Sequence, residues 1–356
     1  MKIIHCSDIH LDSKMEANLT SQQAAERNTE LCETFVRMVH YAAENDVRVI
    51  MISGDLFDTG RVRSTTVGCI LDTVTLHPNI DFLYLRGNHD ESEQAFFRDL
   101  PDNLKLFSDQ WQYHRYGNVV IAGVELAPHN CTSIYTSLQL RSEDMNLVML
   151  HGQETTQPGI ESVCIPSLRN KHIRYLALGH LHSYKLQTLD HSGQYCYCGC
   201  LEGRGFDECG EKGFVLLDIN GDRLSSEFIP FAYRKMHELR VDISDQTQAN
   251  RIAAAMLAAA KDISSKDLVK FILCGSYTTE TNKDLPHLQH TLGSKFYSVK
   301  ISDESKLLLE PSSYENDISL KGEFTRLVMD APLSDSEKER IICAGLQALS
   351  AEEITL

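Results

Sequence analysis

The sequence of 356 residues lacks an apolar run long enough to cross a membrane. Its longest, IAAAMLAAA at 252–260, lies between Arg251 and Lys261 and is far shorter than the roughly 20 residues that a bilayer core requires. The N-terminal MKIIHCSDIH also has too few apolar residues before Asp8 to form the core of a signal peptide. We therefore expect a cytoplasmic protein that does not contact a membrane.

Basic residues are scarce relative to acidic ones. The chain has 34 Lys and Arg against 50 Asp and Glu, which gives a formal net charge of −16. Proteins that bind nucleic acid usually show a basic face, so this charge weighs against a large DNA-binding surface. Clustered carboxylates can instead bind divalent ions, which reverse the local sign of charge. Eleven cysteines, an odd number spread over a long chain, fit reduced thiols better than a disulfide framework.

Neither an internal repeat nor a low-complexity segment is evident, and the length indicates one large domain and one smaller one. Short runs rich in β-branched residues alternate with helical stretches such as 31–45 and 64–77, a pattern typical of an α/β sheet. The runs are KIIHCSD, VRVIMISGD, IDFLYLRGN, NVVIAGVE, NLVMLHG and YLALGH. From about residue 184, hairpins replace this pattern, and GFVLLDINGDRLSSEFI contains an Asn-Gly turn.

The pattern changes again near residue 236, where we place a domain boundary. Residues 236–315 predict a smaller α/β domain with the strands HELRVDI, VKFIL and FYSVKI and an alanine-rich helix near 248–261. Residues 316–356 predict two C-terminal helices, which belong to this domain or dock a partner. SDSE has capping-box spacing at the start of the second helix. The apolar face of the first helix consists of Leu320, Phe324, Leu327 and Val328.

Five of the predicted strands end in residues that commonly bind metals. In an open α/β sheet, ligands gather beyond the carboxyl ends of the strands, so we expect these side chains to meet. One such residue alone is more often part of a turn, but five in order predict a dinuclear metal site. The mixture of carboxylate, imidazole and amide oxygen suits Mn²⁺, Fe or Zn²⁺ better than it suits Ca²⁺, or Mg²⁺ in an all-oxygen site. The residues are Asp8 and His10, Asp55, Asn88 and His89, His151, and His180 with His182.

The order of these motifs, D-x-H, GD, GNHD, H and GHxH, resembles that of the calcineurin-like metallophosphoesterases. SDIHLDS, SGDLFDTG and LRGNHD are similar to the SbcD-type DNA repair exonucleases, especially their YhaO-like branch, and LEGRGFDECGEKGF also resembles that branch. The resemblance covers residues 1–235 and extends further only in outline. It implies a metallophosphoesterase four-layer αββα sandwich over residues 1–235, which carries the nuclease site, with a smaller α/β capping domain.

Carried over residue by residue, the resemblance implies two divalent metal ions. Mn²⁺ is the first choice, with Fe, Zn²⁺ or Mg²⁺ as alternatives. The ligands would be Asp8, His10 and His182 for one ion and Asn88, His151 and His180 for the other, with Asp55 bridging both. Such a pair can polarise a phosphodiester and lower the pKa of a bridging water, which gives a hydroxide for in-line attack.

The resemblance makes His89 the general acid that protonates the leaving 3′ or 5′ oxygen. Asp58 matches the position that orients this histidine in many metallophosphoesterases. The archaeal and eukaryotic relatives resemble GDLFH there, with a histidine in place of Asp58, so DNA strands should be presented to the site differently. We interpret Asp90 as a cap or as a residue that orients a ligand.

Other residues fit two interpretations. The run YCYCGC at 195–200 alternates three cysteines, which favours three small apolar side chains on one strand face over a zinc site with C-x₂₋₄-C pairs. Arg61, Arg63 and Arg204 lie near the motifs and fit either phosphate contacts, for which a planar guanidinium is suited, or surface ion pairs. The helix 31–45 packs on the sheet or, as the resemblance implies, contributes to a dimer interface; we favour packing.

We therefore expect a metal-dependent DNA nuclease that hydrolyses phosphodiester bonds at DNA ends or hairpins in DNA repair. The resemblance implies a homodimer beside an SbcC-like ATPase. Phosphate contacts would need only a local basic strip and the two metals. The acidic composition leaves an alternative, a small-molecule or nucleotide phosphodiesterase or phosphatase of the same superfamily. A third hypothesis is an interaction module with docking tail helices, but such a scaffold needs neither seven ligands nor a positioned acid.

Overall fold

The computed structural model describes the chain except for residues 16–18, 59–61, 91–99, 279–280, 309–316 and 350–356. The described residues form two compact units, Met1–Met236 and His237–Leu356. The predicted boundary between 315 and 316 falls within 309–316 and so lies outside the described residues. Within the described part of the chain, we find no helix that is both long and apolar enough to span a membrane.

The first unit contains two six-stranded sheets. In the first sheet, with the order β14-β13-β1-β2-β3-β4, strands β1 to β4 are parallel and β13 and β14 are added antiparallel. The β13–β14 hairpin turns at the predicted Asn-Gly, where Asn220 pairs with Arg223. The strands are β1 (Lys2–Cys6), β2 (Val47–Ser53), β3 (Asp81–Leu85), β4 (Leu104–Leu106), β13 (Gly213–Asn220) and β14 (Arg223–Pro230).

The second sheet has the order β11-β12-β10-β7-β6-β5, with parallel strands in the centre and antiparallel β5 and β11 at the edges. Its strands are β5 (Gln112–Tyr116), β6 (Val119–Gly123), β7 (Met145–His151), β10 (Ile173–Gly179), β11 (Lys185–Thr188) and β12 (Gln194–Tyr197). Between β7 and β10, β8 (Gln153–Thr155) and β9 (Ser162–Cys164) form a separate two-stranded ribbon.

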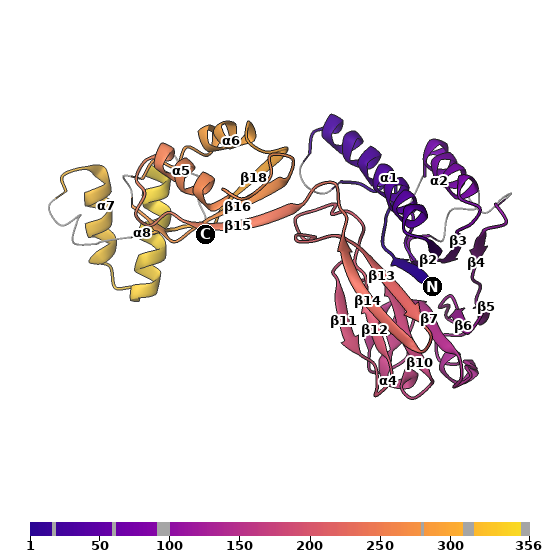
Figure 1. Ribbon diagram of the computed structural model, residues 1–356. Coiled ribbons are helices and arrows are strands. Elements are labelled where there is room, and N and C mark those ends of the chain that lie inside the picture. Colours follow the sequence, from indigo (N-terminus) through magenta and orange to yellow (C-terminus); the bar gives the residue numbers. More distant parts are fainter. Residues whose placement is uncertain (16–18, 59–61, 91–99, 279–280, 309–316, 350–356) are drawn as a thin grey trace. The chain divides into compact units, whose positions relative to one another are not determined.

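The two sheets pack face to face, and helices cover their outer faces. Buried side chains such as Met51 from the first sheet and Leu147 from the second fill the space between them. α1 (Ser21–Glu44) and α2 (Ser64–Leu76) lie side by side on the first sheet (Figure 1). The one-turn helices α3 (Ile134–Ser137) and α4 (Ile165–Leu168) pack on the second. This confirms the αββα sandwich, with a thin fourth layer.

Helix α1 begins ten residues earlier than the predicted stretch 31–45. A capping box starts it, because the Thr20 hydroxyl accepts from the backbone of Gln23 and the Gln23 side chain accepts from the backbone of Thr20. The first turns are polar, so apolar periodicity cannot reveal them, yet Arg27 and Glu30 are buried there as an ion pair. The helix was therefore underestimated because ionic contacts replace apolar ones in its first half.

The second unit contains the predicted strands and α5, and also a helix, α6, that we did not predict. Its main sheet has the order β15-β16-β18, and α5 and α6 share its apolar core. The elements are β15 (Met236–Asp242), α5 (Ala249–Ala259), β16 (Leu268–Cys274), β17 (Ser276–Tyr277), α6 (Leu285–Gly293), β18 (Ser298–Asp303), β19 (Lys306–Leu307), α7 (Leu320–Met329) and α8 (Asp335–Leu349).

Helices α7 and α8 pack on each other through a small apolar cluster that includes Phe324 and Val328. The predicted capping box opens α8, because the backbone of Ser334 donates to the Glu337 carboxylate at 3.0 Å. The rest of the predicted apolar face of α7 is not covered, since Leu320 and Leu327 are 69% and 64% exposed. Spacing showed that these residues share a face, but not that the face is buried.

A candidate dinuclear metal centre

The predicted ligands lie at the carboxyl ends of five parallel strands, three in the first sheet and two in the second. These strand ends meet at one edge of the sandwich, as expected for an α/β site. The positions are Asp8 and His10 after β1, Asp55 after β2, Asn88 after β3, His151 at the end of β7, and His180 and His182 after β10.

Asp8, His10 and His182 form the first group. One ligand atom from each lies within 4.8 Å of the others, and the Nε2 atoms of the two histidines are 3.1 Å apart. Two imidazole lone pairs at this distance repel each other unless a proton or a cation lies between them. The spacing fits two ligands of one ion with bonds of about 2.1 Å.

Asn88, His151 and His180 form the second group. The Asn88 Oδ1 lies 3.0 Å from Nε2 of His151 and 3.4 Å from Nδ1 of His180. The carbonyl of Ser53 is 2.9 Å from Nδ1 of His151 and accepts its proton, which in the neutral ring leaves the lone pair of Nε2 directed at the amide oxygen. Acceptor atoms again converge, and a divalent cation would satisfy them.

Asp55 lies between the two groups. Its Oδ2 is 3.3 Å from Nε2 of His151 and 3.9 Å from Nε2 of His10, while its Oδ1 accepts from the backbone of His89 at 2.9 Å. Asp8, Asp55 and His151 also bring one ligand atom each within 4.8 Å of one another. A single carboxylate thus reaches both groups, which is the geometry that a bridging ligand requires.

The electrostatics of this cluster favour bound positive charge. Burial alone would raise the pKa of Asp55, but the imidazoles of His151 and His10 outweigh it and hold that pKa well below its ordinary value. Burial would likewise lower the pKa of His151, but the Asp55 carboxylate raises it to about 9. For His10 and His180, burial prevails and lowers the pKa. The raised pKa of His151 indicates a negative electrostatic potential at the site, which would also favour the binding of metal ions.

The backbone at the site is strained. Four of the seven predicted ligands have a positive φ: Asp8 and His10 at 50°, Asp55 at 52° and His180 at 103°. For residues other than glycine, such conformations cost about 1–3 kcal/mol each and cluster at functional sites. Gly54 allows a close approach, because a Cβ at that position would lie 2.1 Å from Nδ1 of His151.

Glu208 is a buried site residue that we did not predict. Nδ1 of His182 donates to its Oε1 at 2.6 Å, which leaves Nε2 of His182 to face His10. Although burial opposes protonation, Glu208 raises the pKa of His182, and a carboxylate in this position makes an imidazole a stronger ligand. The available signal was the segment LEGRGFDECGEKGF, which resembled the family without assigning a role to Glu208.

His89 and Asp58 lie beside the first group. Nδ1 of His89 is 2.9 Å from the Asp58 carboxylate, and the His89 side chain is 35% exposed. The adjacent Asp90 is buried and accepts from the backbone N–H groups of Phe57 and Gly87, each at 2.9 Å. Asp90 therefore caps the two loops that carry Asp55 and Asn88, in agreement with its interpretation from sequence.

The arginines and cysteines that the sequence analysis singled out near the motifs have different surroundings. Arg63 pairs with Asp12 at 2.5 Å, Arg204 pairs with Glu208 at 2.8 Å, and Arg61 lies outside the described residues. The three cysteines of 195–200 are fully buried. Among the described residues, none of the clusters with metal-binding geometry includes a cysteine.

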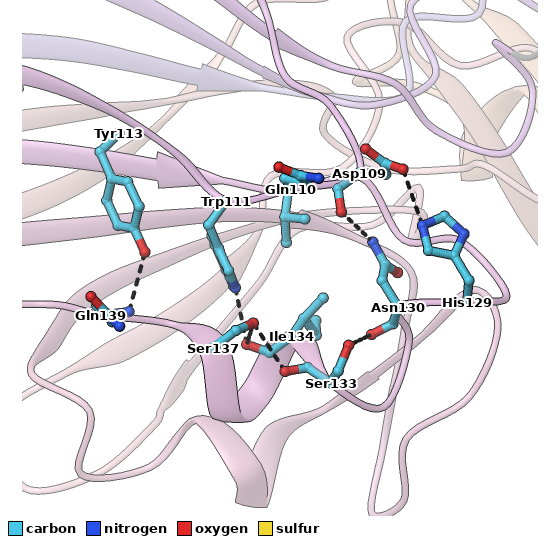
Figure 2. A pocket seen from close by; sticks show the side chains of 11 residues that line it. Asp109, Gln110, Trp111, Tyr113, His129, Asn130, Ser133, Ile134, Ser137 and Gln139 are labelled. Atoms are coloured by element: carbon cyan, nitrogen blue, oxygen red, sulfur yellow. Dashed lines mark hydrogen bonds and ion pairs between the residues drawn. The ribbon is translucent and has the colours of Figure 1, made fainter.

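A separate hollow of about 500 Å³ lies near β5 and β6 and is lined by none of the predicted site residues. Figure 2 shows that its polar groups bond to one another: Nε1 of Trp111 donates to the carbonyl of Ile134, and Asn130 donates to the carbonyl of Asp109. The Tyr113 hydroxyl accepts a hydrogen bond from the backbone N–H of Gln139. Because none of the predicted site residues lines this hollow, we assign it no function.

Comparisons with known proteins show which proteins this chain is similar to. The metallophosphoesterase YhaO of Bacillus subtilis, described as uncharacterized, is 25% identical over 245 residues, which cover 64% of this chain and 60% of YhaO. The DNA double-strand break repair protein Mre11 of Saccharolobus solfataricus is 27% identical over 245 residues, which cover 62% of this chain and 61% of Mre11. The chain thus matches about 60% of the length of each relative.

The crystal structure of TT1561 from Thermus thermophilus has 15% sequence identity and a TM-score of 0.41, and the match covers 64% of this chain and 98% of that one. A sequence model of the calcineurin-like phosphoesterases matches residues 1–184, more than half of the 356 residues. The protein therefore belongs to the calcineurin-like phosphoesterase family.

Proposed function

We propose that this protein is a metal-dependent DNA nuclease that hydrolyses phosphodiester bonds at DNA ends or hairpins during DNA repair. The observation that carries the proposal is the convergence of seven ligand-type side chains from five strand ends. Membership in the phosphoesterase family supports the reaction class. The similarity to a DNA double-strand break repair protein supports DNA as the substrate.

The proposed ligands are those predicted from the sequence: Asp8, His10 and His182 for one ion, Asn88, His151 and His180 for the other, and Asp55 for both. Two divalent ions, Mn²⁺ in our proposal, would polarise the phosphodiester and lower the pKa of a water molecule. The chain supplies the orientation of the ligands: the carbonyl of Ser53 holds the ring of His151, and Glu208 holds that of His182.

His89 is the proposed general acid. Asp58 accepts from its Nδ1 at 2.9 Å, which fixes the ring and leaves Nε2 to donate a proton to the leaving oxygen. The partial exposure of His89 lets a substrate reach this nitrogen.

The net charge of −16 favours a second candidate, a small-molecule or nucleotide phosphodiesterase or phosphatase with the same metal centre. An acidic surface repels the DNA backbone except where basic side chains or metal ions offset it. A small ester needs to reach only the metal centre. The two candidates therefore differ in substrate size rather than in chemistry.

The nuclease proposal also assigns roles to the second unit and to partners. We propose that residues 236–315 act as a capping domain, and that residues 316–356 contribute to the cap or dock an SbcC-like ATPase. Leu320 and Leu327 on α7 are exposed and offer an apolar surface for a helical partner. A homodimer is the proposed assembly. Size-exclusion chromatography with light scattering, alone and with the ATPase, would test both partners.

Hydrolysis by purified protein with and without Mn²⁺ tests the function. The substrates are a labelled linear duplex, a labelled hairpin and bis-p-nitrophenyl phosphate, and His89→Ala protein controls for contaminating nucleases. Metal-dependent cleavage of DNA that is lost in the variant would support the nuclease. Cleavage of the small ester alone would favour the second candidate, and no cleavage of any substrate would contradict both.

A further inference from the structure

Arg204 lies beside the metal centre but has no role in the proposed function. Its backbone N–H donates to Oε2 of Glu208 at 2.7 Å, and its Nε and Nη2 lie 3.2 and 2.8 Å from Oε1. The side chain is only 15% exposed. Glu208 thus binds one edge of the guanidinium and fixes its plane.

The other edge of the guanidinium is directed toward the reaction site. Nη1 lies 4.0 Å from the carboxylate of Asp58, the residue that holds His89. This distance is too long for a hydrogen bond, and we find no closer acceptor for Nη1 among the described residues. On the other side, Nη2 is 3.2 Å from Nδ1 of His182, although both nitrogens donate to Glu208 and so do not bond to each other.

The backbone around Arg204 is held from the opposite side by a buried network. Glu202 accepts from Arg27 at 2.9 Å and from Thr34 at 2.8 Å, and Arg27 also donates to the carbonyl of Gly203 at 3.0 Å. Arg27, Thr34 and Glu202 are all buried. The guanidinium is therefore positioned before any substrate binds, and a preorganised donor loses little entropy when it binds a ligand.

We propose that Arg204 binds a non-bridging oxygen of the phosphate group that is cleaved. A guanidinium with one edge anchored and one donor directed at the site suits a phosphoryl oxygen, because charge-assisted N–H···O⁻ bonds are short and directional. This inference rests on the proposed function and adds a phosphate contact that comes from the protein rather than from the metals. It also places the fixed positive charge near His89, where the leaving oxygen would lie.

Arg63 provides a matched comparison on the same unit. Its Nε and Nη2 bond to Asp12 at 2.7 and 2.5 Å, and its side chain is 54% exposed. The fork of Arg63 is thus occupied by a carboxylate in a solvated position, whereas Arg204 keeps a desolvated donor at the site. We therefore expect a phosphate contact from Arg204 and an ordinary ion pair from Arg63.

The test compares wild-type protein with Arg204→Gln, Arg204→Lys and Arg63→Gln. Binding of inorganic phosphate to the Mn²⁺-loaded proteins is measured by isothermal calorimetry, and bound Mn²⁺ by elemental analysis. Arg204→Gln should weaken phosphate binding at least about tenfold at unchanged Mn²⁺ content, Arg204→Lys should recover part of the affinity, and Arg63→Gln should match wild type. KM for bis-p-nitrophenyl phosphate should rise in parallel.

Unchanged phosphate affinity in Arg204→Gln would overturn the inference, as would a wild-type protein that does not bind phosphate. Loss of Mn²⁺ from Arg204→Gln would also overturn it, because Arg204 would then act by positioning His182 through Glu208. The nuclease proposal fails separately, if wild-type protein binds phosphate and cleaves the small ester but leaves DNA intact. In that case Arg204 would still bind the phosphate group, but the substrate would be a smaller phosphoester.

Discussion

Acidification should destabilise the first unit through His5, which lies on β1 between the two sheets. His5 is fully buried, and its Nδ1 is 2.9 Å from the hydroxyl of Tyr175 on β10. Burial lowers the pKa of His5 from 6.5 to about 3, because a buried imidazolium loses its hydration. The folded protein therefore keeps His5 neutral at pH values where the unfolded chain protonates it.

The magnitude follows from the two pKa values. Above pH 6.5, His5 does not reduce the free energy of unfolding, because its imidazole is then neutral in both the folded and the unfolded state. As the pH falls below 6.5, the unfolded chain binds a proton that the folded protein excludes, so the free energy of unfolding decreases by about 1.4 kcal/mol per pH unit until about pH 3. Between pH 7.5 and 5, the loss from His5 alone should be about 2 kcal/mol.

Urea unfolding of wild-type and His5→Gln protein at the two pH values measures this loss. Trp111 is the single tryptophan and lies in the first unit, so its fluorescence reports on the unfolding of that unit. EDTA in all samples removes the pH dependence of metal binding. The decrease in unfolding free energy between pH 7.5 and 5 should be about 2 kcal/mol smaller in the variant. An equal decrease in both proteins would refute the reasoning.

Three further predictions concern the site and its support. His89→Ala should retain bound metal yet lose most turnover, whereas Asp55→Ala should lose metal as well, as measured by elemental analysis and hydrolysis of bis-p-nitrophenyl phosphate. Arg27→Met should lower the free energy of urea unfolding by about 3–5 kcal/mol, because it leaves the buried carboxylate of Glu202 without its cation. Gly54→Ala should destabilise the first unit by about 1–3 kcal/mol and reduce metal content, because the added Cβ would overlap the ring of His151.

Matched variants separate these effects from general damage. Gly68→Ala places a Cβ where no heavy atom lies within 4 Å and should not destabilise α2. Arg115→Met removes a surface pair with Asp144 and should change the unfolding free energy little. Metal retention in Asp55→Ala would contradict the bridging role, and a small effect of Arg27→Met would show that its carboxylate partners tolerate burial without it.

The strands that carry the site residues could be predicted from the sequence because β-branched runs bury on both faces, and the motif order carried the fold; the order of the strands within the two sheets was not predicted. The position of Glu208 could not, because its contact with His182 spans 26 residues and depends on how the segment after β12 folds back. The first turns of α1 were missed for a related reason. Arg27 and Glu30 are buried through ion pairs, and ionic burial leaves no apolar period to detect.

The location of the ligands could be expected from topology, but their relative geometry could not. The sequence places Asp55 and His151 at the ends of predicted strands, whereas the 3.3 Å between them results from the packing of the two sheets. The positive φ angles at Asp8 and His180 are also set by the folded environment. Aspartate and histidine adopt such angles more readily than most residues, but the local sequence does not show at which positions they do so.

Because the candidate metal centre takes ligands from both sheets, it is complete only when the two halves of the sandwich are docked. Ions that bind there would act as a clamp between the sheets, and each would stabilise the docked state by RT ln(1 + [M]/Kd). Chelation should then lower the melting temperature of the first unit while leaving the strands themselves intact. In such a protein, metal supply would control persistence in the cell as well as turnover, since the apo form would open more often to proteases.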